Sequence, residues 1–244
     1  MKRFRFNLLF YAAMAFFLTS CNGNGNKTTT TDTTATADTT ANTVAPQSTT
    51  ITTPQYMIVV THKVANFAKW KSAYDEHDSA RLSYGIHNYV IGRGTKDSNM
   101  VLVALRADDT TKAKAFAKDP GLKKAMQKGG VIGVPSISLV TIVFQDTARL
   151  NTDLRSAATF SVKDWDAWQK AFEDGKQERM DNGITDRAYG HDLDDNKKVT
   201  VVTVPSDTAK AFAYYNSNAL KERRKAAGVL GEPKRFLYRV VQVY

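Results

Sequence analysis

The chain has 244 residues, a net charge of +10 and a single cysteine, which excludes an internally disulfide-bonded scaffold and a multi-cysteine zinc module. Hydrophobic residues make up 42% of the chain, enough to bury a core, so we expect one or two globular domains. The four histidines form no HExxH or comparable motif, and we therefore expect no metal site.

The N-terminal 21 residues have the pattern of an export signal. Three basic residues among the first five precede an apolar run over 6–18, which is too short to span a bilayer as a helix. The frame Leu18-Thr19-Ser20-Cys21 that follows resembles the processing site of bacterial lipoproteins. The resemblance implies a signal peptide over 1–20, lipidation of Cys21 with palmitate-like acyl chains, and attachment to the cell envelope at the outer membrane. The alternative is an ordinary secreted protein with a cysteine near its cleavage site by chance.

A threonine-rich segment comes next. Residues 22–53 contain 14 threonines in 32 positions and almost no large apolar side chain. Such a composition buries too little apolar surface to offset the entropy of ordering the chain. We therefore expect a disordered stalk over 21–54.

The remaining sequence contains an internal repeat. At an offset of 98 residues, 21 of the 72 positions between 64 and 135 are identical to their counterparts between 162 and 233, without a gap. This repeat predicts two copies of one module, over 55–148 and 149–244.

Hydrophobic periodicity predicts the elements of each copy. The first copy reads as a strand at 56–62, a helix at 66–84 ended by Gly85, strands at 87–93 and 99–106, short helices at 110–118 and 121–128, and a strand at 136–144. The second copy reads as 154–160, 164–182, 185–191, 197–204, 206–225 and 234–243 in the same order. The order β-α-β-β-α-β is that of the ferredoxin-like fold, an α+β fold with one apolar sheet face left to cover. We expect the two modules to pack sheet to sheet as a pseudo-dimeric α/β barrel.

Two motifs that both copies carry strengthen this interpretation. The frame Trp-(x10)-Arg-(x3)-Gly-Ile, followed by Gly-Val-x-Gly-x-Pro, resembles small, mostly uncharacterised bacterial proteins of the dimeric α/β-barrel superfamily, over about residues 55–244. That superfamily includes cofactor-free monooxygenases, haem-binding and haem-degrading proteins, decarboxylases and non-catalytic modules. No catalytic motif of its characterised members matches this chain. The Gly-Val-x-Gly-x-Pro segment itself predicts either a tight turn before the last strand or a backbone site for a ligand oxygen.

The first predicted helix has a stripe that is half aromatic and half polar. Trp70, Tyr74, His77 and Arg81 lie on one side of it, and Trp168, Phe172, Gly175 and Arg179 form the corresponding stripe in the second copy. One hypothesis is a cleft between helix and sheet, where Arg81 or Arg179 holds an anion and the tryptophan supplies an apolar wall. In the alternative, the tryptophan belongs to the core and the arginine pairs with a structural carboxylate.

The histidines separate the two copies. His62, His77 and His87 are replaced by Phe160, Gly175 and Thr185 in the second copy, so a site that uses them would exist in the first copy alone. Basic residues also gather in the second helical region of both copies, where we expect a solvated face or contact with anionic head groups. They are Lys123, Lys124, Lys128, Lys221, Arg223, Arg224 and Lys225.

These observations favour a non-catalytic envelope lipoprotein that binds a small anionic or aromatic ligand in a helix–sheet cleft, without a cofactor. Its expected partners are the lipid bilayer, through acylated Cys21, and the small ligand, but no nucleic acid. We expect a monomer that contains an internal pseudo-dimer. The alternatives are an enzyme of the cofactor-independent monooxygenase type or a haem-handling protein, active in the first module only, and a structural or partner-binding module.

Overall fold

A computed structural model describes residues 49–244, so the predicted signal, Cys21 and most of the predicted stalk lie outside the described residues. After a short strand β1, Thr50–Ile51, the first half has the order strand, two helices, two strands, two helices, strand. Its elements are β2 Gln55–Val64, α1 Phe67–Glu76, α2 Asp78–Ser83, β3 Ile86–Gly94, β4 Met100–Ala107, α3 Thr110–Ala117, α4 Pro120–Lys128 and β5 Val131–Asp146. The second half repeats the order with β6 Leu154–Val162, α5 Trp165–Asp174, α6 Lys176–Asp181, β7 Ile184–Asp192, β8 Lys198–Pro205, α7 Thr208–Tyr215, α8 Asn218–Ala226 and β9 Val229–Val243.

Capping residues explain where the helices begin. Asn66, Asp109, Asp164 and Asp207 each accept a hydrogen bond from the backbone N–H three residues later, at the start of α1, α3, α5 and α7. Each polar side chain satisfies a backbone donor that the first helical turn leaves without a partner. The same cap therefore recurs at corresponding places in both halves.

The long helices predicted over 66–84 and 164–182 are each broken in two. His77 separates α1 from α2 with φ −88° and ψ 10°, and Gly175 separates α5 from α6 with φ −86° and ψ 7°. The prediction of single helices was wrong because a break of one residue hardly changes which side chains share a face, so the apolar spacing continues across it. The segment predicted as one helix over 206–225 is likewise two helices, and Ser217 caps the second.

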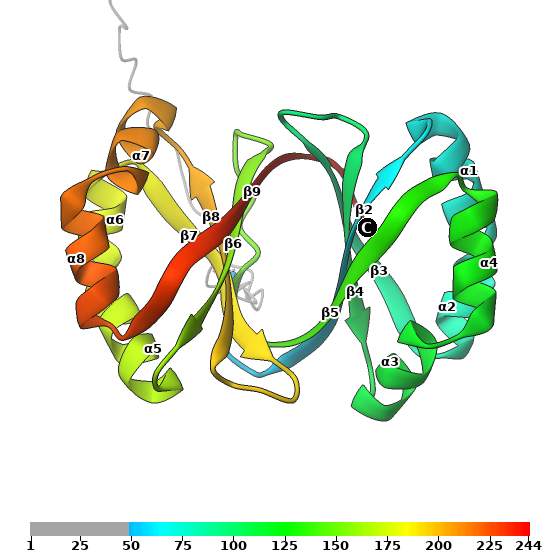
Figure 1. Ribbon diagram of the computed structural model, residues 1–244, viewed down its shortest axis with the longest axis horizontal. Coiled ribbons are helices and arrows are strands. Elements are labelled where there is room, and N and C mark those ends of the chain that lie inside the picture. Colours follow the sequence, from blue (N-terminus) through cyan, green and yellow to red (C-terminus); the bar gives the residue numbers. More distant parts are fainter. Residues whose placement is uncertain (1–48) are drawn as a thin grey trace, which may run out of the picture. The chain divides into compact units, whose positions relative to one another are not determined.

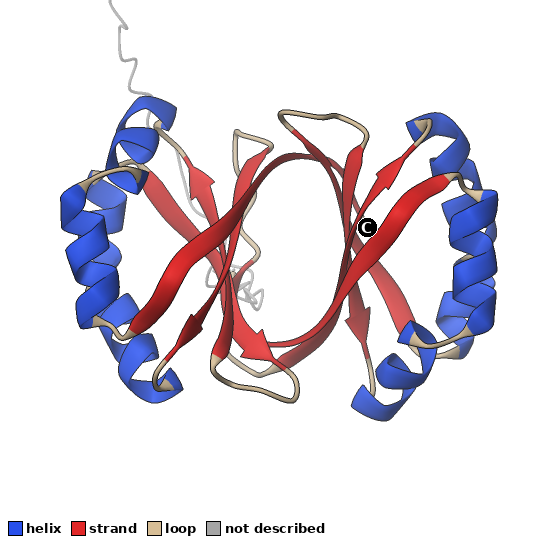
Figure 2. Cartoon of the chain, viewed as in Figure 1, coloured by secondary structure: helices blue, strands red, loops and turns tan. Residues whose placement is uncertain are grey.

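The strands of both halves join into one closed ring. The strand order is β5-β2-β4-β3 in the first half and β9-β6-β8-β7 in the second, and the pairings β3–β9 and β5–β7 connect the two sheets at both edges. Figure 1 shows α1–α4 on one outer side of this ring and α5–α8 on the opposite side, and Figure 2 shows the strands around a central opening. The two sheets therefore face each other, as expected, but hydrogen bonds also join their edges into a barrel.

Four apolar clusters fill the interior of the described residues, and the smallest joins Ile184, Ala211 and Tyr214 in the second half. One lies between the first-half helices and the sheet around Trp70 and Phe116, and a second lies around Trp165 and Trp168 in the second half. The third, with Met57, Val140 and Ile142, lies on the inner face of the barrel. Burying each large apolar side chain contributes roughly 1.5–3 kcal/mol, so the clusters between helices and sheet dominate the stability of each half.

The segment Gly-Val-x-Gly-x-Pro lies inside a strand in both halves. β5 and β9 already begin at its valine, and its second glycine, Gly133 or Gly231, has a φ of 73° or 67°. The paired strand shifts register opposite this point, between Thr61 and Lys63 in the first half, which identifies a β-bulge. The predicted turn before the last strand is present only at the first glycine of the segment, where Gly130 has a φ of 76°, and the residues that follow belong to the strand. Within residues 49–244, no helix is both long enough and apolar enough to cross a membrane.

Candidate functional site

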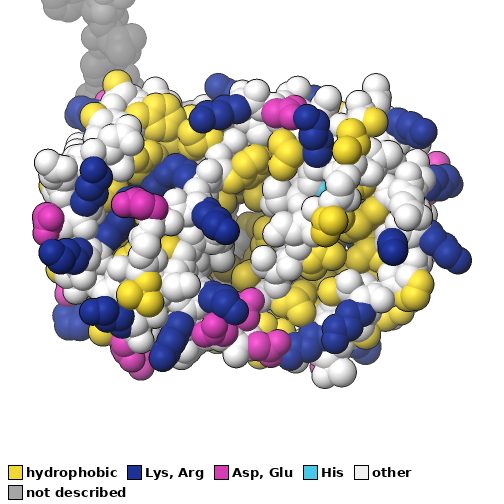
Figure 3. All heavy atoms as spheres, in the orientation of Figure 1, with side chains coloured by type: hydrophobic (Ala, Val, Ile, Leu, Met, Phe, Trp, Pro, Cys, Tyr) yellow, Lys and Arg dark blue, Asp and Glu magenta, His cyan; other side chains and the backbone are white. Residues whose placement is uncertain are grey.

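Each half contains a cleft between its helices and the outer face of the barrel. The first-half cleft has a cavity volume of about 50 Å³ and the second-half cleft about 90 Å³. In Figure 3, hydrophobic side chains are visible in the hollows between helices and sheet.

The structure brings the residues of the predicted stripe together. Trp70, Tyr74, His77 and Arg81 all line the first-half cleft, although the break at His77 places them on two helices. Trp168, Phe172 and Arg179 line the second-half cleft. In each cleft the tryptophan stacks on the next aromatic ring of the stripe, at 5.1 Å between centroids. One wall of each cleft is therefore aromatic.

Arg179 has a structural role in the second half. Its Nε and Nη2 donate to both carboxylate oxygens of Asp186 at 2.8 and 2.6 Å, and its Nη1 donates to the carbonyl oxygen of Phe172 at 2.6 Å. The guanidinium also lies 3.6 Å above the Phe172 ring. All three guanidinium nitrogens of Arg179 therefore have hydrogen-bond partners within the protein. This arrangement favours the hypothesis that Arg179 pairs with a structural carboxylate over the hypothesis of an anion site.

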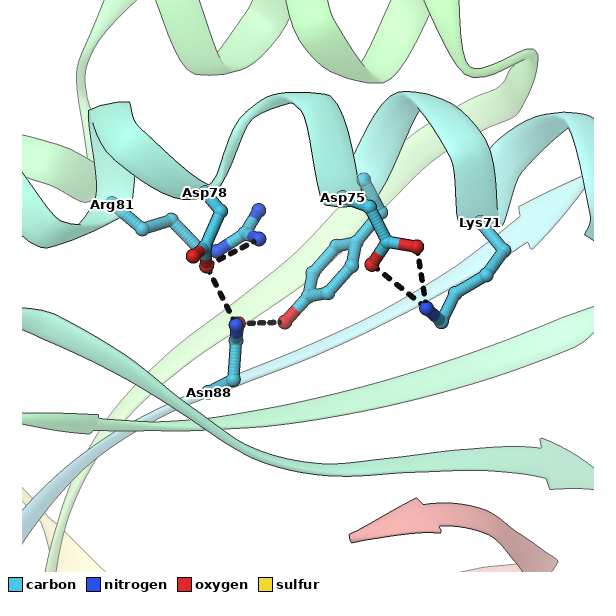
Figure 4. Close-up of polar contacts among 6 residues, drawn as sticks. Lys71, Asp75, Asp78, Arg81 and Asn88 are labelled. Carbon is cyan, nitrogen blue, oxygen red and sulfur yellow. Dashed lines mark hydrogen bonds and ion pairs between the residues drawn. The ribbon is translucent and has the colours of Figure 1, made fainter. Parts of the chain in front are cut away.

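Arg81 has a different environment, because Asn88 stands at the position of Asp186. Its Nη2 donates to Asp78 at 3.1 Å and its guanidinium lies 3.8 Å above the Tyr74 ring, while its Nε has no partner among the described residues. Asn88 accepts a hydrogen bond from the Tyr74 hydroxyl and donates one to the same Asp78 oxygen (Figure 4). Arg81, 2% exposed, is therefore less fully neutralised than its counterpart.

The histidines do not converge on one point. His62 and His77 line the first-half cleft, whereas His87 pairs with Asp108 at 2.9 Å on the surface. His191 lies in the second half, with its ring 4.7 Å from that of Trp165. Both ring nitrogens of His62 are covered and have no hydrogen-bond partner among the described residues, and burial lowers the pKa of this histidine to about 4. Burial, and then the charge of Arg81, lower the pKa of His77.

His62 makes the stability of the protein depend on pH. In the unfolded chain it takes up a proton near its ordinary pKa of 6.5, but in the folded protein only near pH 4. Between these values the unfolded state binds more protons, so stability falls as the pH drops from about 6.5 to about 4, by roughly 3 kcal/mol. Phenylalanine fills the equivalent position 160, and we expect His62→Phe to remove this component. Urea unfolding at pH 7 and pH 4.5 measures it, and equal acid sensitivity of both proteins would contradict the assignment.

Three further arginines of the second-half cleft lie outside the predicted helix stripe. Arg223, Arg224 and Arg235 line this cleft, and Glu178 pairs with Arg223 while it accepts a hydrogen bond from Tyr214. Arg223 and Arg224 had been expected on a solvated or lipid-facing surface, but both are only partly exposed because α8 folds them over the cleft. The sequence did contain a signal: at an offset of 98 residues, these three arginines replace Ala125, Met126 and Ile137.

No protein-family model matches the sequence, and no curated protein is similar to it. Solved structures share its fold. A "putative monooxygenase" from Fusobacterium nucleatum subsp. nucleatum has a TM-score of 0.52 at 12% identity, over 79% of this chain and 95% of its own. An anthrone oxidase-like protein has a TM-score of 0.55 at 14% identity, over 80% and 95%. These neighbours are dimeric α/β-barrel proteins, and at such identity the likeness shows the fold alone. Residues 49–244 contain no group of three or more His, Cys, Asp or Glu placed to hold a metal ion.

Proposed function

We propose that the protein is a lipid-tethered envelope protein whose second-half cleft binds a small aromatic anion. The observation that carries this proposal is the state of Arg224 and Arg235. Among the described residues, neither has a carboxylate at ion-pairing distance, whereas Arg179 and Arg223 in the same cleft both have one. Burial lowers the pKa of both Arg224 and Arg235, so their charged forms lack part of the solvation that water would give.

Arg235 is also held in place. Its Nη1 donates to the Ser156 hydroxyl at 2.6 Å, and its guanidinium lies 3.7 Å above the Tyr215 ring. These contacts orient the group but do not neutralise it. A carboxylate in the cleft would supply the missing charge and accept hydrogen bonds from the planar guanidinium.

The rest of the second-half cleft suits a flat, apolar ligand body. Phe160, Trp168 and Phe172 form neighbouring parts of its wall, with ring centroids 5.6 Å and 5.1 Å from that of Trp168. Offset or edge contacts at such distances stabilise a further aromatic ring. The proposed ligand therefore combines a ring with a carboxylate or similar group.

The test is calorimetric titration of the full chain carrying Cys21→Ser, with benzoate and with neutral benzyl alcohol as probes. We expect Arg235→Gln to weaken benzoate binding by about tenfold or more, since a hydrogen bond to a charged group contributes roughly 1.5–3 kcal/mol, and to change benzyl alcohol binding little. Lys225→Gln removes the same charge from an exposed position of α8 and serves as the matched control. Benzoate affinity that is equal in all three proteins would overturn the proposal.

The tether is the second part of the proposal, and it is supported by the signal pattern and the Leu-Thr-Ser-Cys frame. Two or three acyl chains on Cys21 would hold the protein firmly at the outer membrane. We expect the wild-type chain in the membrane fraction with incorporated radiolabelled palmitate, and Cys21→Ser without label. Label on the Cys21→Ser protein would exclude this residue as the lipid site.

We further propose that the two halves are ferredoxin-like modules that arose by duplication. Their repeated element order and the ring of strands support this, since each half covers the inner sheet face of the other. One chain would then replace a homodimer, and the protein would be a monomer.

An enzyme or haem-handling protein active in the first half has less support from the geometry. Neither His62 nitrogen can be reached in this conformation, and His87 lies outside the first-half cleft. His77, at the junction of α1 and α2, remains the histidine of that cleft that a substrate or a haem iron could approach.

A further inference from the structure

The interior of the barrel contains a third cavity, which is separate from both clefts. This lumen has a cavity volume of about 110 Å³ and lies between the two halves (Figure 3). A second hollow, lined by the linker residues 147–153, adjoins it, and Arg155, Arg187, Val240 and Val243 line both. The lumen therefore continues into this hollow at one end, which we call the mouth.

The mouth carries two arginines without a carboxylate partner. Arg155, which is 8% exposed, donates from Nη1 to the carbonyl oxygens of Thr152 and Leu154 at 2.8 and 2.9 Å. Arg187 donates from Nη1 to the carbonyl oxygen of Ala148 at 2.7 Å. Among the residues that the structure describes, neither guanidinium forms an ion pair, because the mouth carboxylate of Asp153 pairs with Arg239 at 2.5 Å. Both arginines line the lumen and the adjoining hollow, and burial, then the charge of Arg187, lower the pKa of Arg155.

Further polar groups gather at the same end of the lumen. Gln145 is 3% exposed and donates to the Tyr89 hydroxyl, while its Oε1 has no partner among the described residues. Arg106 lies 4.5 Å above the Tyr89 ring, and its buried Nε also has no partner there. Buried polar atoms normally have a partner, so Gln145 Oε1 and Arg106 Nε are unsatisfied polar atoms within the wall at this end of the lumen.

The wall further from the mouth is apolar. Val59 lies opposite Ala104 in the β2–β4 pairing, and Leu102 is two residues further along β4 from the mouth than Ala104. Ala157 and Val202 occupy the corresponding places on the paired strands β6 and β8. A chain that enters between the arginines would therefore contact hydrocarbon along the lumen.

The fold itself does not require these charges. At the offset of 98 residues, Arg155 and Arg187 correspond to Met57 and Tyr89, which line the same lumen without a charge. A buried, unpaired guanidinium costs free energy that methionine at the matching position does not. The barrel architecture therefore does not explain the unpaired Arg155 and Arg187 of the second half. An anionic ligand would explain them.

We propose that the lumen binds a single-chain amphipathic anion of the fatty-acid class, with its carboxylate at Arg155 and Arg187 and its hydrocarbon chain along the apolar wall. This site is separate from the second-half cleft and does not depend on the function proposed for it.

Calorimetric titration of the full chain carrying Cys21→Ser tests this proposal, without detergent and with straight-chain acids from hexanoate to dodecanoate. We expect the affinity to rise by about fourfold per methylene until the apolar wall is covered. The double variant Arg155→Gln/Arg187→Gln should lose about tenfold or more of the affinity for the acids but little for the matching alkanols. Arg235→Gln, in the second-half cleft, should leave the binding of both unchanged.

A third variant tests the location independently of charge. Ala157→Phe places a ring in the lumen and should abolish the binding of acids and alkanols alike, while benzoate binding to the cleft persists. Thermal unfolding of each variant shows whether it remains folded. Acid affinity that is unchanged in both the arginine and the Ala157 variants would overturn the lumen site, and loss of acid affinity in Arg235→Gln alone would assign the binding to the cleft.

Discussion

Gly190→Ala is expected to destabilise the protein by more than about 3 kcal/mol, because the substitution acts on a seam that closes the barrel. Gly190 on β7 pairs with Ile142 on β5. A Cβ at this glycine would lie 2.0 Å from the carbonyl oxygen of Thr141 and 2.7 Å from the Cα of Ile142. Both are backbone atoms, so no side-chain rotation relieves the clash, and β5 and β7 would have to separate. Chemical denaturation monitored by tryptophan fluorescence measures the loss.

Gly133→Ala is the matched control for this substitution. A Cβ at Gly133 would meet nothing within 4 Å, although the residue has a φ of 73°. Gly133→Ala should therefore cost only the strain of a non-glycine residue at a positive φ, roughly 1–2 kcal/mol. Equal stability losses in the two variants would contradict a closed seam at Gly190.

Asp186→Asn is expected to cost about 3–5 kcal/mol, because it leaves the buried charge of Arg179 without a counter-charge. The side chains of Arg179 and Asp186 are 8% and 7% exposed, and two hydrogen bonds join them. An amide at this position could accept a hydrogen bond from only one guanidinium nitrogen and would remove the ion pair. Urea unfolding at pH 7 gives the change in the free energy of unfolding.

A surface ion pair provides the comparison. Lys170 and Asp174 pair at 2.8 Å with side chains that are 78% and 63% exposed, and we expect Asp174→Asn to leave the unfolding midpoint unchanged. If wild type and Asp186→Asn unfold at a similar midpoint, another group neutralises the guanidinium of Arg179. That result would contradict a structural role for the pair of Arg179 and Asp186.

The repeat explains why so much of the secondary structure could be predicted. Strands predicted over 56–62, 87–93 and 99–106 lie within β2, β3 and β4, except that the last begins one residue early, and the short helices near 110–118 and 121–128 are α3 and α4. Alternating apolar residues, capping side chains and a glycine after α2 are local signals, and each occurs twice. The helix break at His77 and the β-bulge at Gly133 were missed because they leave the apolar pattern on either side intact.

The structure brings the residues of the predicted stripe together in a cleft, but the partners of their charged groups could not be predicted. Because residues at helical spacing share a face, the stripe from Trp70 to Arg81 already indicated a cleft against the sheet. The partners of its arginines come from another element: Asp186 on β7 for Arg179, and Asn88 on β3 in place of such a carboxylate for Arg81. Arg224 and Arg235 reach the second-half cleft from α8 and β9. No pattern within one helix indicates such contacts.

The sequence by itself determined the duplicated order of elements, the apolar faces and the positions at which the two halves differ, because these depend on side-chain type and spacing along the chain. Only the tertiary structure decided that the strands close into a ring, that Arg179 is neutralised while Arg155 and Arg187 are not, and that a lumen with a cationic mouth lies between the halves. The physical reason is that burial and charge pairing are set by contacts between different elements: Asp186 reaches Arg179 from β7, and the lumen exists only because β3 meets β9 and β5 meets β7.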